Sequence, residues 1–260
     1  MRASAASPPA GFKSFEVPSA RVVCAERLGE TVREMLESGT LYEYARMHPD
    51  ARSLAGRAVA YAVPLPGRTD RVVVRHNRHG GLLASLTGDL FRWPSRAPLE
   101  LETSMRLLNA GIATPEFAAY ALYPAALGFC RADVMTLEVP SSHDLSAAIM
   151  NPDRACRAAA WRATAQLIRS LTAAGARHHD LNVKNVLLRD SADGHLDALV
   201  LDVDRVTFSN DHAAVLEANL ARLLRSAHKW QASYGAPITD SELAELAAMA
   251  RDPGLSSTRS

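Results

Sequence analysis

The sequence predicts a two-lobed α+β fold that divides near residue 140. Two patterns support this prediction: short apolar runs separated by turn residues dominate the first half, and alanine-rich helical sequence dominates the second. The chain has 260 residues, 48% hydrophobic and 22% charged, so it can bury a sizeable core without disulfides or structural metals. We expect a small β-rich N-terminal lobe and a mainly helical C-terminal lobe.

Composition and charge exclude several classes of protein. A formal net charge of +1 argues against a nucleic-acid partner, so any basic function must be local. The three cysteines form neither a C-x-x-C pair nor a zinc-like cluster, which fits a reducing compartment. No uncharged run approaches the roughly 20 residues that span a bilayer, and the N-terminal segment lacks the apolar core of a signal peptide. We therefore expect a cytoplasmic protein with no transmembrane segment.

The first half contains most of the expected strands. Residues 1–20 are rich in Ser, Ala and Pro and are expected to form a flexible tail, and residues 21–139 form the expected N-terminal lobe. Apolar spacing predicts a helix over 25–38, which ends at Gly39. The other expected elements are a hairpin of strands at 57–63 and 71–75, a helix at 99–109, and strands at 117–123 and 134–139.

The second half, residues 140–260, is expected to form the helical lobe with the catalytic loop. Trp161 and Trp230 lie on helical stretches and are expected in the core. The expected elements are helical sequence at 142–174, short strands at 186–188 and 199–203, and helices at 211–229 and 240–251.

One segment of the second half carries a catalytic pattern. From His178 to Leu188 the spacing is H-x-D-L-x-x-x-N followed by three apolar residues, which is the pattern of the kinase catalytic loop. Fourteen residues later, Asp202 follows an apolar strand, where kinases carry a metal-binding aspartate. Phosphoryl transfer needs a carboxylate that accepts the proton of the attacking hydroxyl, and oxygen ligands that hold Mg²⁺ against the phosphates. We expect Asp180 to be this base, and Asn185 and Asp202 to hold the metal.

Each of these residues alone is a weak signal, because an H-x-D pattern or an aspartate after a strand is common by chance. Their order, with apolar strands after Asn185 and before Asp202, makes the joint pattern strong. A competing hypothesis takes His178, His179 and His195 as metal ligands. These histidines lack the i, i+4 spacing of helical zinc ligands, so we disfavour it.

A site of this kind also needs a cation for the ATP phosphates on a strand of the first lobe, and a helical carboxylate that pairs with it. Arg75 ends an apolar strand, at the position where protein kinases have lysine, and a guanidinium can bind phosphate bidentately. Glu100 on the following helix is favoured over Glu102 as its partner. No G-x-G-x-x-G loop is present, and Gly56 remains the candidate for a nucleotide-binding glycine.

Several segments go beyond the general kinase pattern. They are His178-x-Asp180-Leu-Asn-x-x-Asn185, Leu201-Asp202-x-Asp204-Arg205, Val74-Arg75-His76-x-Arg78-x-Gly80-Gly81-Leu82, Gly128-Phe-x-Arg131-Ala-Asp133 and Asn219-Leu-x-Arg222-Leu-x-Arg225-Ser226. Together they resemble the 3-deoxy-D-manno-octulosonic acid (Kdo) kinase family, part of the lipopolysaccharide kinase group within the protein-kinase-like fold. The resemblance runs from about Gly56 to Lys229, and the R-H-x-R-x-G-G-L and N-L-x-R-L-x-R-S segments are its most particular features.

This resemblance implies a bilobal protein-kinase-like fold and a transfer of phosphate from ATP, with Mg²⁺, to a hydroxyl of Kdo on the lipid A precursor. It implies peripheral association with the cytoplasmic face of the inner membrane. We group His178 with the catalytic residues and Asp204 with the substrate-binding residues. The chain departs from the family at Val203, where phenylalanine is usual, and the N-terminal helical region near 25–47 has no counterpart that we can match.

A basic stretch from Arg68 to Arg96 agrees with an anionic, membrane-bound acceptor. Its arginines are interleaved with leucines and aromatic residues, and we expect Arg78, Arg92 and Arg96 to contact the substrate. The alternative is an ordinary solvated surface. The arginines of the stretch are residues 68, 71, 75, 78, 92 and 96.

Two other functions remain as alternatives. A soluble small-molecule phosphotransferase of the aminoglycoside or choline type shares the catalytic loop. A nucleotide-binding scaffold without catalysis would fit the absence of a glycine-rich loop. The presence of Asp180, Asn185 and Asp202 argues against such a scaffold.

Overall fold

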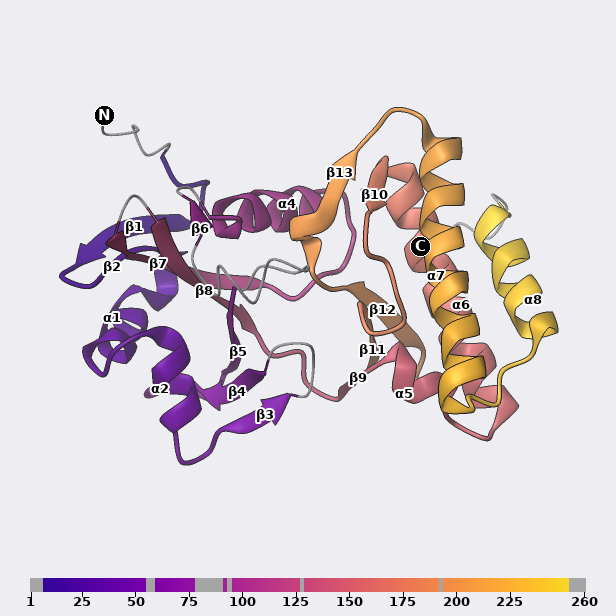
Figure 1. The fold of residues 1–260 in the computed structure, drawn as a ribbon, viewed down its shortest axis with the longest axis horizontal. Helices are drawn as coiled ribbons and strands as arrows, with labels where there is room; N and C mark the ends of the chain where they lie inside the picture. Colours follow the sequence, from indigo (N-terminus) through magenta and orange to yellow (C-terminus); the bar gives the residue numbers. More distant parts are fainter. Residues whose placement is uncertain are drawn as a thin grey trace. The chain divides into compact units, whose positions relative to one another are not determined.

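The computed structural model describes residues 7–54, 59–77, 91–92, 95–126, 129–191 and 194–252, and Figure 1 traces the chain. The fold divides into unit 1, Met1–Glu102 with Glu116–Glu138, and unit 2, Thr103–Pro115 with Val139–Ser260. The division after residue 138 lies close to the expected one. The end of α4 (Ala97–Asn109) differs from expectation, because Leu107 and Ile112 join the core of unit 2.

Unit 1 is built on an antiparallel sheet whose described strands run in the order β1-β2-β7-β8-β5-β4-β3, with β6 paired to β8. Strand β7 is buried along almost its whole length. Because β5 lies between β4 and β8, Arg75 is held in register with Ala60 on one side and Val134 on the other. The strands are β1 (Phe12–Val17), β2 (Ala20–Ala25), β3 (Arg52–Leu54), β4 (Ala60–Pro64), β5 (Arg71–His76), β6 (Phe91–Arg92), β7 (Phe117–Pro124) and β8 (Phe129–Leu137).

Two short helices, α1 (Gly29–Glu37) and α2 (Leu41–Met47), pack on this sheet (Figure 1). Val32 and Met35 of α1 are fully buried against it, as apolar residues three places apart on one helix face should be. Helix α2 begins with a capping box: the Thr40 hydroxyl accepts the Glu43 N–H at 3.1 Å, and the Glu43 carboxylate accepts the Thr40 N–H at 3.0 Å. This box fixes where α2 starts.

A buried carboxylate attaches α2 to the sheet. Asp133 of β8 is fully buried, and its two oxygens lie 3.0 Å from the Tyr42 amide nitrogen and 2.6 Å from His76 Nδ1. The Tyr123 hydroxyl accepts the Leu41 N–H at 2.9 Å, and burial, together with the charge of Asp133, raises the pKa of Tyr123. The first amide groups of a helix have no partner inside it, and the sheet satisfies those of Leu41 and Tyr42 in α2.

The N-terminal segment is more ordered than its composition predicted. Residues 1–20 were expected to form a tail, but β1 begins at Phe12 and pairs with β2 from Phe12↔Ala25 to Val17↔Ala20. Phe12, Phe15 and Val17 pack against the buried cluster of unit 1, which stabilises the hairpin. The helix expected from Ala25 instead begins at Gly29, after the short 3-10 turn η1 (Glu26–Leu28).

Unit 2 is mainly helical, as expected, and carries two small antiparallel sheets with the orders β12-β11-β9 and β10-β13. Within the ranges that the structure describes, no helix is both long and apolar enough to cross a membrane. The elements are β9 (Ser142–Asp144), α5 (Leu145–Ile149), α6 (Arg154–Ala173), β10 (Ala176–His178), β11 (Val186–Asp190), β12 (Leu196–Val200), η3 (Val203–Arg205), β13 (Val206–Phe208), α7 (His212–Tyr234) and α8 (Asp240–Arg251).

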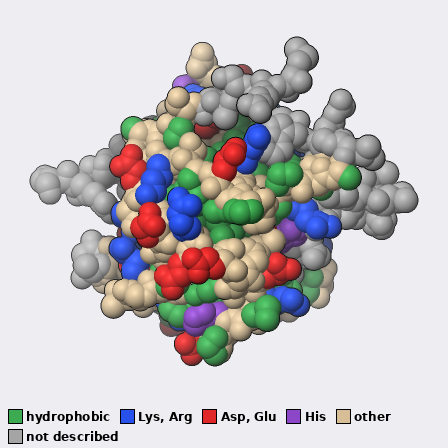
Figure 2. All heavy atoms as spheres, turned by 90° about the vertical axis from the view of Figure 1, so that its left-hand side faces the viewer, with side chains coloured by type: hydrophobic (Ala, Val, Ile, Leu, Met, Phe, Trp, Pro, Cys, Tyr) green, Lys and Arg blue, Asp and Glu red, His purple; other side chains and the backbone are tan. Residues whose placement is uncertain are grey.

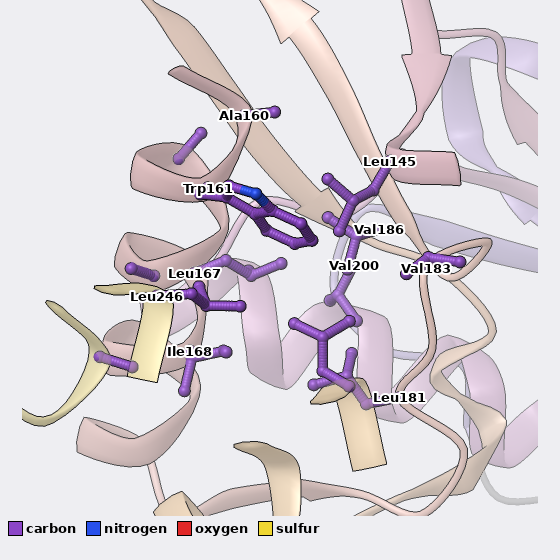
Figure 3. Packing of buried hydrophobic residues seen from close by; sticks show 14 of the residues in the cluster. Leu145, Ala160, Trp161, Leu167, Ile168, Leu181, Val183, Val186, Val200 and Leu246 are labelled. Atoms are coloured by element: carbon purple, nitrogen blue, oxygen red, sulfur yellow. The ribbon is translucent and has the colours of Figure 1, made fainter. Parts of the chain in front are cut away.

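The core of unit 2 forms around Trp161 of α6, which is 2% exposed (Figure 3). Leu181 and Val183, from the segment with the catalytic pattern, belong to the same cluster and are 1% and 0% exposed. Burying an aliphatic side chain of this size stabilises a fold by about 1.5–3 kcal/mol. The expected position of Trp161 in the core is confirmed, and the core anchors the segment that carries the catalytic pattern.

A buried ion pair joins α6 to α8. Arg157 donates to Glu242 Oε1 from Nε at 3.1 Å and from Nη2 at 2.9 Å, and its Nη1 donates to the carbonyls of Asn151 and Pro152. Both side chains are nearly inaccessible to solvent. Glu242 also completes the capping box of α8 with Thr239. The pair thus satisfies a cation that burial would otherwise leave without a partner.

Replacing Glu242 by glutamine should lower the free energy of unfolding by about 3 kcal/mol, because it leaves Arg157 as a buried cation without a carboxylate. Glutamine has only one acceptor oxygen, so the change also removes either the capping hydrogen bond from Thr239 or the hydrogen bonds from Arg157. Glu245→Gln is the matched control: it breaks an exposed pair with Arg154 on the same two helices and should cost less than about 1 kcal/mol. Urea unfolding measures both values, and equal losses would contradict the prediction.

Candidate active site

The expected metal ligands lie at one end of a β-hairpin in unit 2. Asn185 directly precedes β11, and Asp202 follows β12 after a single residue. The two strands pair with Val186 opposite Val200, and the Leu201 N–H donates to the Asn185 carbonyl at 2.9 Å. Since antiparallel pairing places the start of β11 beside the end of β12, the fold brings Asn185 and Asp202 together.

Hydrogen bonds within the loop fix the backbone at Asp180. Its carbonyl accepts the side-chain amides of Asn182 at 2.8 Å and Asn185 at 2.9 Å. Asp180 is half-buried, whereas Asn185 is 7% exposed. Because the amide nitrogen of Asn185 points into the loop, its amide oxygen is the atom available to a cation.

Asp202 has a left-handed backbone, with φ 53° and ψ 49°. This conformation costs a non-glycine residue about 1–2 kcal/mol, although aspartate tolerates it better than most. Strain of this kind is concentrated at functional sites, where the surrounding structure imposes it. Asp202 lies between the end of β12 and the start of η3, where the backbone changes direction, and the residue is exposed.

His178 is a buried residue that contacts both the loop of Asp180 and the residue before Asp202. It is fully buried at the end of β10; its Nδ1 accepts the Asp180 N–H at 3.1 Å, and its Nε2 lies 2.9 Å from the Leu201 carbonyl. An imidazole that accepts at Nδ1 must be neutral and donate from Nε2. Burial lowers the pKa of His178, which favours the same neutral form. We grouped His178 with the catalytic residues, but its buried position gives it a positioning role.

Asn219 of α7 is a site residue that the sequence analysis missed. It is fully buried, its Oδ1 accepts the His178 N–H, and its Nδ2 donates to the Ala176 carbonyl, both at 2.9 Å. One side chain therefore satisfies both backbone groups on this edge of β10. The polar residue in the N-L-x-R-L-x-R-S segment was visible in the sequence, but periodicity alone could not show that it faces inward.

The phosphate-binding candidate in unit 1 also has the expected partner. Arg75 of β5 forms an ion pair with Glu100 at the start of α4, and its Nη1 donates to Asn77 Oδ1 at 3.0 Å. Glu100 is buried, whereas Glu102 is exposed on the same helix. The predicted pairing with Glu100 is thus confirmed, and Asn77 is an additional contact that the sequence pattern did not indicate.

The structure does not test the expected roles of several residues that were assigned to the substrate or the nucleotide. Gly56 and Arg78 lie outside the described residues, and only the backbone of Arg92 is described. Arg96 is exposed just before α4, and Asp204 is half-buried in η3. These five residues therefore remain candidates on sequence grounds.

The described part of the basic stretch is largely neutralised within unit 1. Arg68 pairs with Asp70 at 3.2 Å, and Arg71 pairs with Glu138 at 2.9 Å. Figure 2, which looks at the molecule from the left-hand side of Figure 1, shows basic and acidic side chains interspersed. A high count of arginines in this stretch does not by itself create a basic surface.

The donors in unit 2 fit a magnesium ion. Mg²⁺ prefers hard oxygen ligands and usually takes one or two protein side chains together with phosphate oxygens and water. Asn185 and Asp202 supply an amide oxygen and a carboxylate at the same end of the hairpin. Across the described ranges, no group of three or more His, Cys, Asp or Glu side chains is placed to hold a metal ion by itself. This donor set therefore suits a metal that arrives with a phosphate ligand.

The fold and the loop residues define a kinase-like phosphotransferase. Its β-rich unit carries a paired arginine, and its helical unit carries a catalytic-type aspartate beside two oxygen donors. The sequence model of the lipopolysaccharide kinase (Kdo/WaaP) family matches residues 52–249. The chain belongs to this family, and it is a phosphotransferase with an alcohol group as the acceptor.

Curated relatives agree with this assignment. The chain is similar to a 3-deoxy-D-manno-octulosonic acid kinase of Haemophilus influenzae (strain PittEE), with 31% identity over 181 residues that cover 67% of this chain and 73% of the relative. The kinase of the same name from Vibrio parahaemolyticus serotype O3:K6 (strain RIMD 2210633) is 28% identical over 68% of this chain and 72% of the relative. That from Xanthomonas oryzae pv. oryzae (strain PXO99A) is 29% identical over 74% of each.

A solved structure supports the fold class. WaaP, solved in complex with acyl carrier protein, aligns with a TM-score of 0.57 over 90% of both chains at 19% identity. At this identity the likeness concerns the fold. The expected bilobal, kinase-like α+β class is confirmed.

Stability should depend on pH through His178. Because the pKa of His178 is lowered by burial in the folded protein, the unfolded chain binds more protons as pH falls below about 6.5, and the free energy of unfolding decreases there. Above that pH the contribution is fully present. We expect His178→Gln to be less stable at pH 8 but to lose less stability between pH 8 and 5.

Urea unfolding at several pH values measures this difference. His143→Gln, which changes an exposed histidine of β9, is the matched control and should follow the wild-type pH curve. Parallel pH curves for wild type and His178→Gln would contradict the assignment of the neutral form.

Proposed function

We propose that this protein transfers the γ-phosphate of ATP to a hydroxyl of Kdo on the lipid A precursor, with Mg²⁺ held by Asn185 and Asp202. The observation that carries the proposal is the placement of these two donors at one end of the β11–β12 hairpin, next to the loop of Asp180. The family assignment and the names of the Kdo kinase relatives support the acceptor.

Asp180 acts as the general base in this reaction. Its carboxylate takes the proton of the sugar hydroxyl as the hydroxyl oxygen bonds to the γ-phosphorus. The bond from that phosphorus to the β,γ-bridging oxygen breaks, and ADP leaves with the electron pair. Mg²⁺, when bound, neutralises the charge on the phosphate oxygens. The hydrogen bonds from Asn182 and Asn185 to the Asp180 carbonyl keep the base in a fixed place.

Arg75 contacts the nucleotide phosphates. Its side chain is 28% exposed, while that of Glu100 is only 5% exposed, so the carboxylate orients the guanidinium from the buried side. A guanidinium binds phosphate oxygens through its planar set of N–H groups, and the carboxylate fixes the orientation of this set. Gly56 is proposed to lie near the same nucleotide.

The acceptor requires contact with a membrane surface. We infer peripheral association with the cytoplasmic face of the inner membrane, in which Arg78, Arg92 and Arg96 contact the lipid-linked substrate and Asp204 contacts its sugar. The support is the family assignment. Arg68, Arg71 and Arg75 of the same stretch have carboxylate partners in unit 1.

The decisive assay incubates the protein with γ-labelled ATP, Mg²⁺ and Kdo-linked lipid A precursor. Wild type should label the lipid, and Asp180→Asn should label it at least about 100-fold more slowly, because general-base catalysis is lost. Asp202→Asn should lose Mg²⁺-dependent turnover because a carboxylate ligand of the metal is gone, with its fold intact because asparagine tolerates a left-handed backbone.

The control for both variants is Asp190→Asn, an exposed aspartate at the end of β11 that should leave the rate unchanged. Labelling of a soluble alcohol in place of the lipid would overturn the acceptor assignment. ATP binding without any transfer would overturn the enzymatic one.

Nucleotide affinity should depend on which glutamate of α4 is changed. Glu100→Gln should raise the Kd for Mg·ATP at least about tenfold, because Arg75 loses its orienting charge. Glu102→Gln, two residues away and exposed, should leave the Kd within about twofold. Calorimetric titration of the two variants compares them directly, and equal affinities would remove Arg75 from the nucleotide site.

A further inference from the structure

Helix α7 follows the catalytic segment along one face (Figure 1). Asn219 binds the backbone at Ala176 and His178, and the Ser226 hydroxyl accepts the Val183 N–H at 3.3 Å. Trp230 comes four residues later, one helical turn beyond Ser226. Positions i, i+7 and i+11 lie on the same side of a helix, so all three face the segment that contains Asp180.

An aromatic pair at the end of this face lies beside a lysine of the loop. The rings of Trp230 and Tyr234 stack with their centroids 4.6 Å apart, and Lys184 Nζ lies 5.7 Å from the Trp230 centroid. Tyr234 is 56% exposed, and Lys184 is also exposed. Trp230, expected in the core, packs only partly against it. The pair is therefore accessible.

The backbone of the loop directs Lys184 outward. Leu181 and Val183 belong to the cluster drawn in Figure 3 and are buried, while Asn182 and Lys184, which alternate with them, are not. Lys184 stands four residues after the base and directly before Asn185. A group bound by Lys184 is thus held close to the atoms that react.

Positive charge borders the same face of α7. Arg222 contributes to lowering the pKa of His179, after burial and the nearby Arg177, which places the Arg222 guanidinium near the start of the loop. Within the described residues, no ion pair is recorded for Arg222, Arg225, Lys229 or Lys184. Other arginines of unit 2 do have carboxylate partners: Arg154, Arg157, Arg189 and Arg251. By helical spacing Arg222 and Lys229 lie next to the face formed by Asn219, Ser226 and Trp230, so this side of α7 carries positive charge.

We propose that Lys184, Trp230 and Tyr234 form the subsite that binds the acceptor sugar, and that Lys184 contacts an anionic group of that sugar. This inference rests on the proposed function and adds the residues that determine the specificity of the enzyme for its acceptor. The aromatic pair packs against the apolar face of a sugar ring, and the lysine supplies the charge that fixes its orientation. Arg222, Arg225 and Lys229 attract the anion to this face.

Steady-state kinetics with the Kdo-linked lipid tests the subsite. Lys184→Gln and Tyr234→Ala should each raise the KM for the acceptor at least about tenfold, since a hydrogen bond to a charged group or an aromatic contact is lost, with the KM for ATP within about twofold. Trp230→Phe should retain more of the acceptor affinity than Trp230→Leu. Arg162→Gln, an exposed arginine of α6, is the matched control and should change neither constant.

Two acceptors separate the possible sources of the anion. A methyl glycoside of Kdo carries the carboxylate but no lipid phosphate, and its carboxylate methyl ester carries neither charge. If Lys184 binds the sugar carboxylate, wild type prefers the acid to the ester at least about tenfold and Lys184→Gln does not. A Lys184 effect seen only with the phosphorylated lipid would assign the lysine to a lipid phosphate and overturn the contact with the sugar.

A binding measurement tests the subsite even if the protein transfers no phosphate. Titration with the Kdo glycoside should quench tryptophan fluorescence in wild type and not in Trp230→Phe. Quenching that depends on Trp230, without phosphate transfer, would support the subsite and refute the proposed function. Transfer to the lipid with acceptor KM values unchanged in all the variants would refute the subsite and leave the function standing.

Discussion

A neutral, buried imidazole holds the candidate active site of unit 2 together. His178 receives the Asp180 N–H on one nitrogen and contacts the Leu201 carbonyl with the other, so it joins the residue expected to act as base to the residue before Asp202. These two hydrogen bonds require one protonated and one unprotonated ring nitrogen. The positions of Asp180 and Asp202 therefore depend on a side chain that is itself fully buried.

The same division between buried support and exposed chemistry recurs around the loop. Alternate residues enter the core at Leu181 and Val183, and a helix that carries Asn219 satisfies the adjoining backbone. The loop of Asp180 is therefore held in one conformation, because the core packs against it from one side and the hydrogen bonds of Asn219 fix the adjoining backbone. The left-handed backbone of Asp202 is the local strain that this support sustains.

Features that depend on spacing along the chain could be predicted from the sequence, whereas features that depend on contacts between distant residues could not. Asp180, Asn185 and Asp202 could be found because the order of loop and strands along the chain sets their spacing. Glu100 and Glu102 could be distinguished only modestly, since the answer depends on which side of α4 meets β5. The β1 strand was missed, because its apolar residues stabilise it only through contacts with distant parts of unit 1. Asn77, Asn219 and the accessibility of Trp230 likewise depend on tertiary neighbours.

The attachment of α2 to Asp133 bears on where this protein can be divided. The family match begins at residue 52, after α2 has ended, yet the amide of Tyr42 is a partner of a fully buried carboxylate in the central part of the sheet. A fragment limited to the matched region would contain Asp133 without that donor, and a buried charge that loses a hydrogen bond is costly. Asp133 is also the register partner of His76, the residue next to Arg75. The β1–β2 hairpin and helices α1 and α2 thus belong to the folded β-rich unit, although they lie outside the region that matches the family.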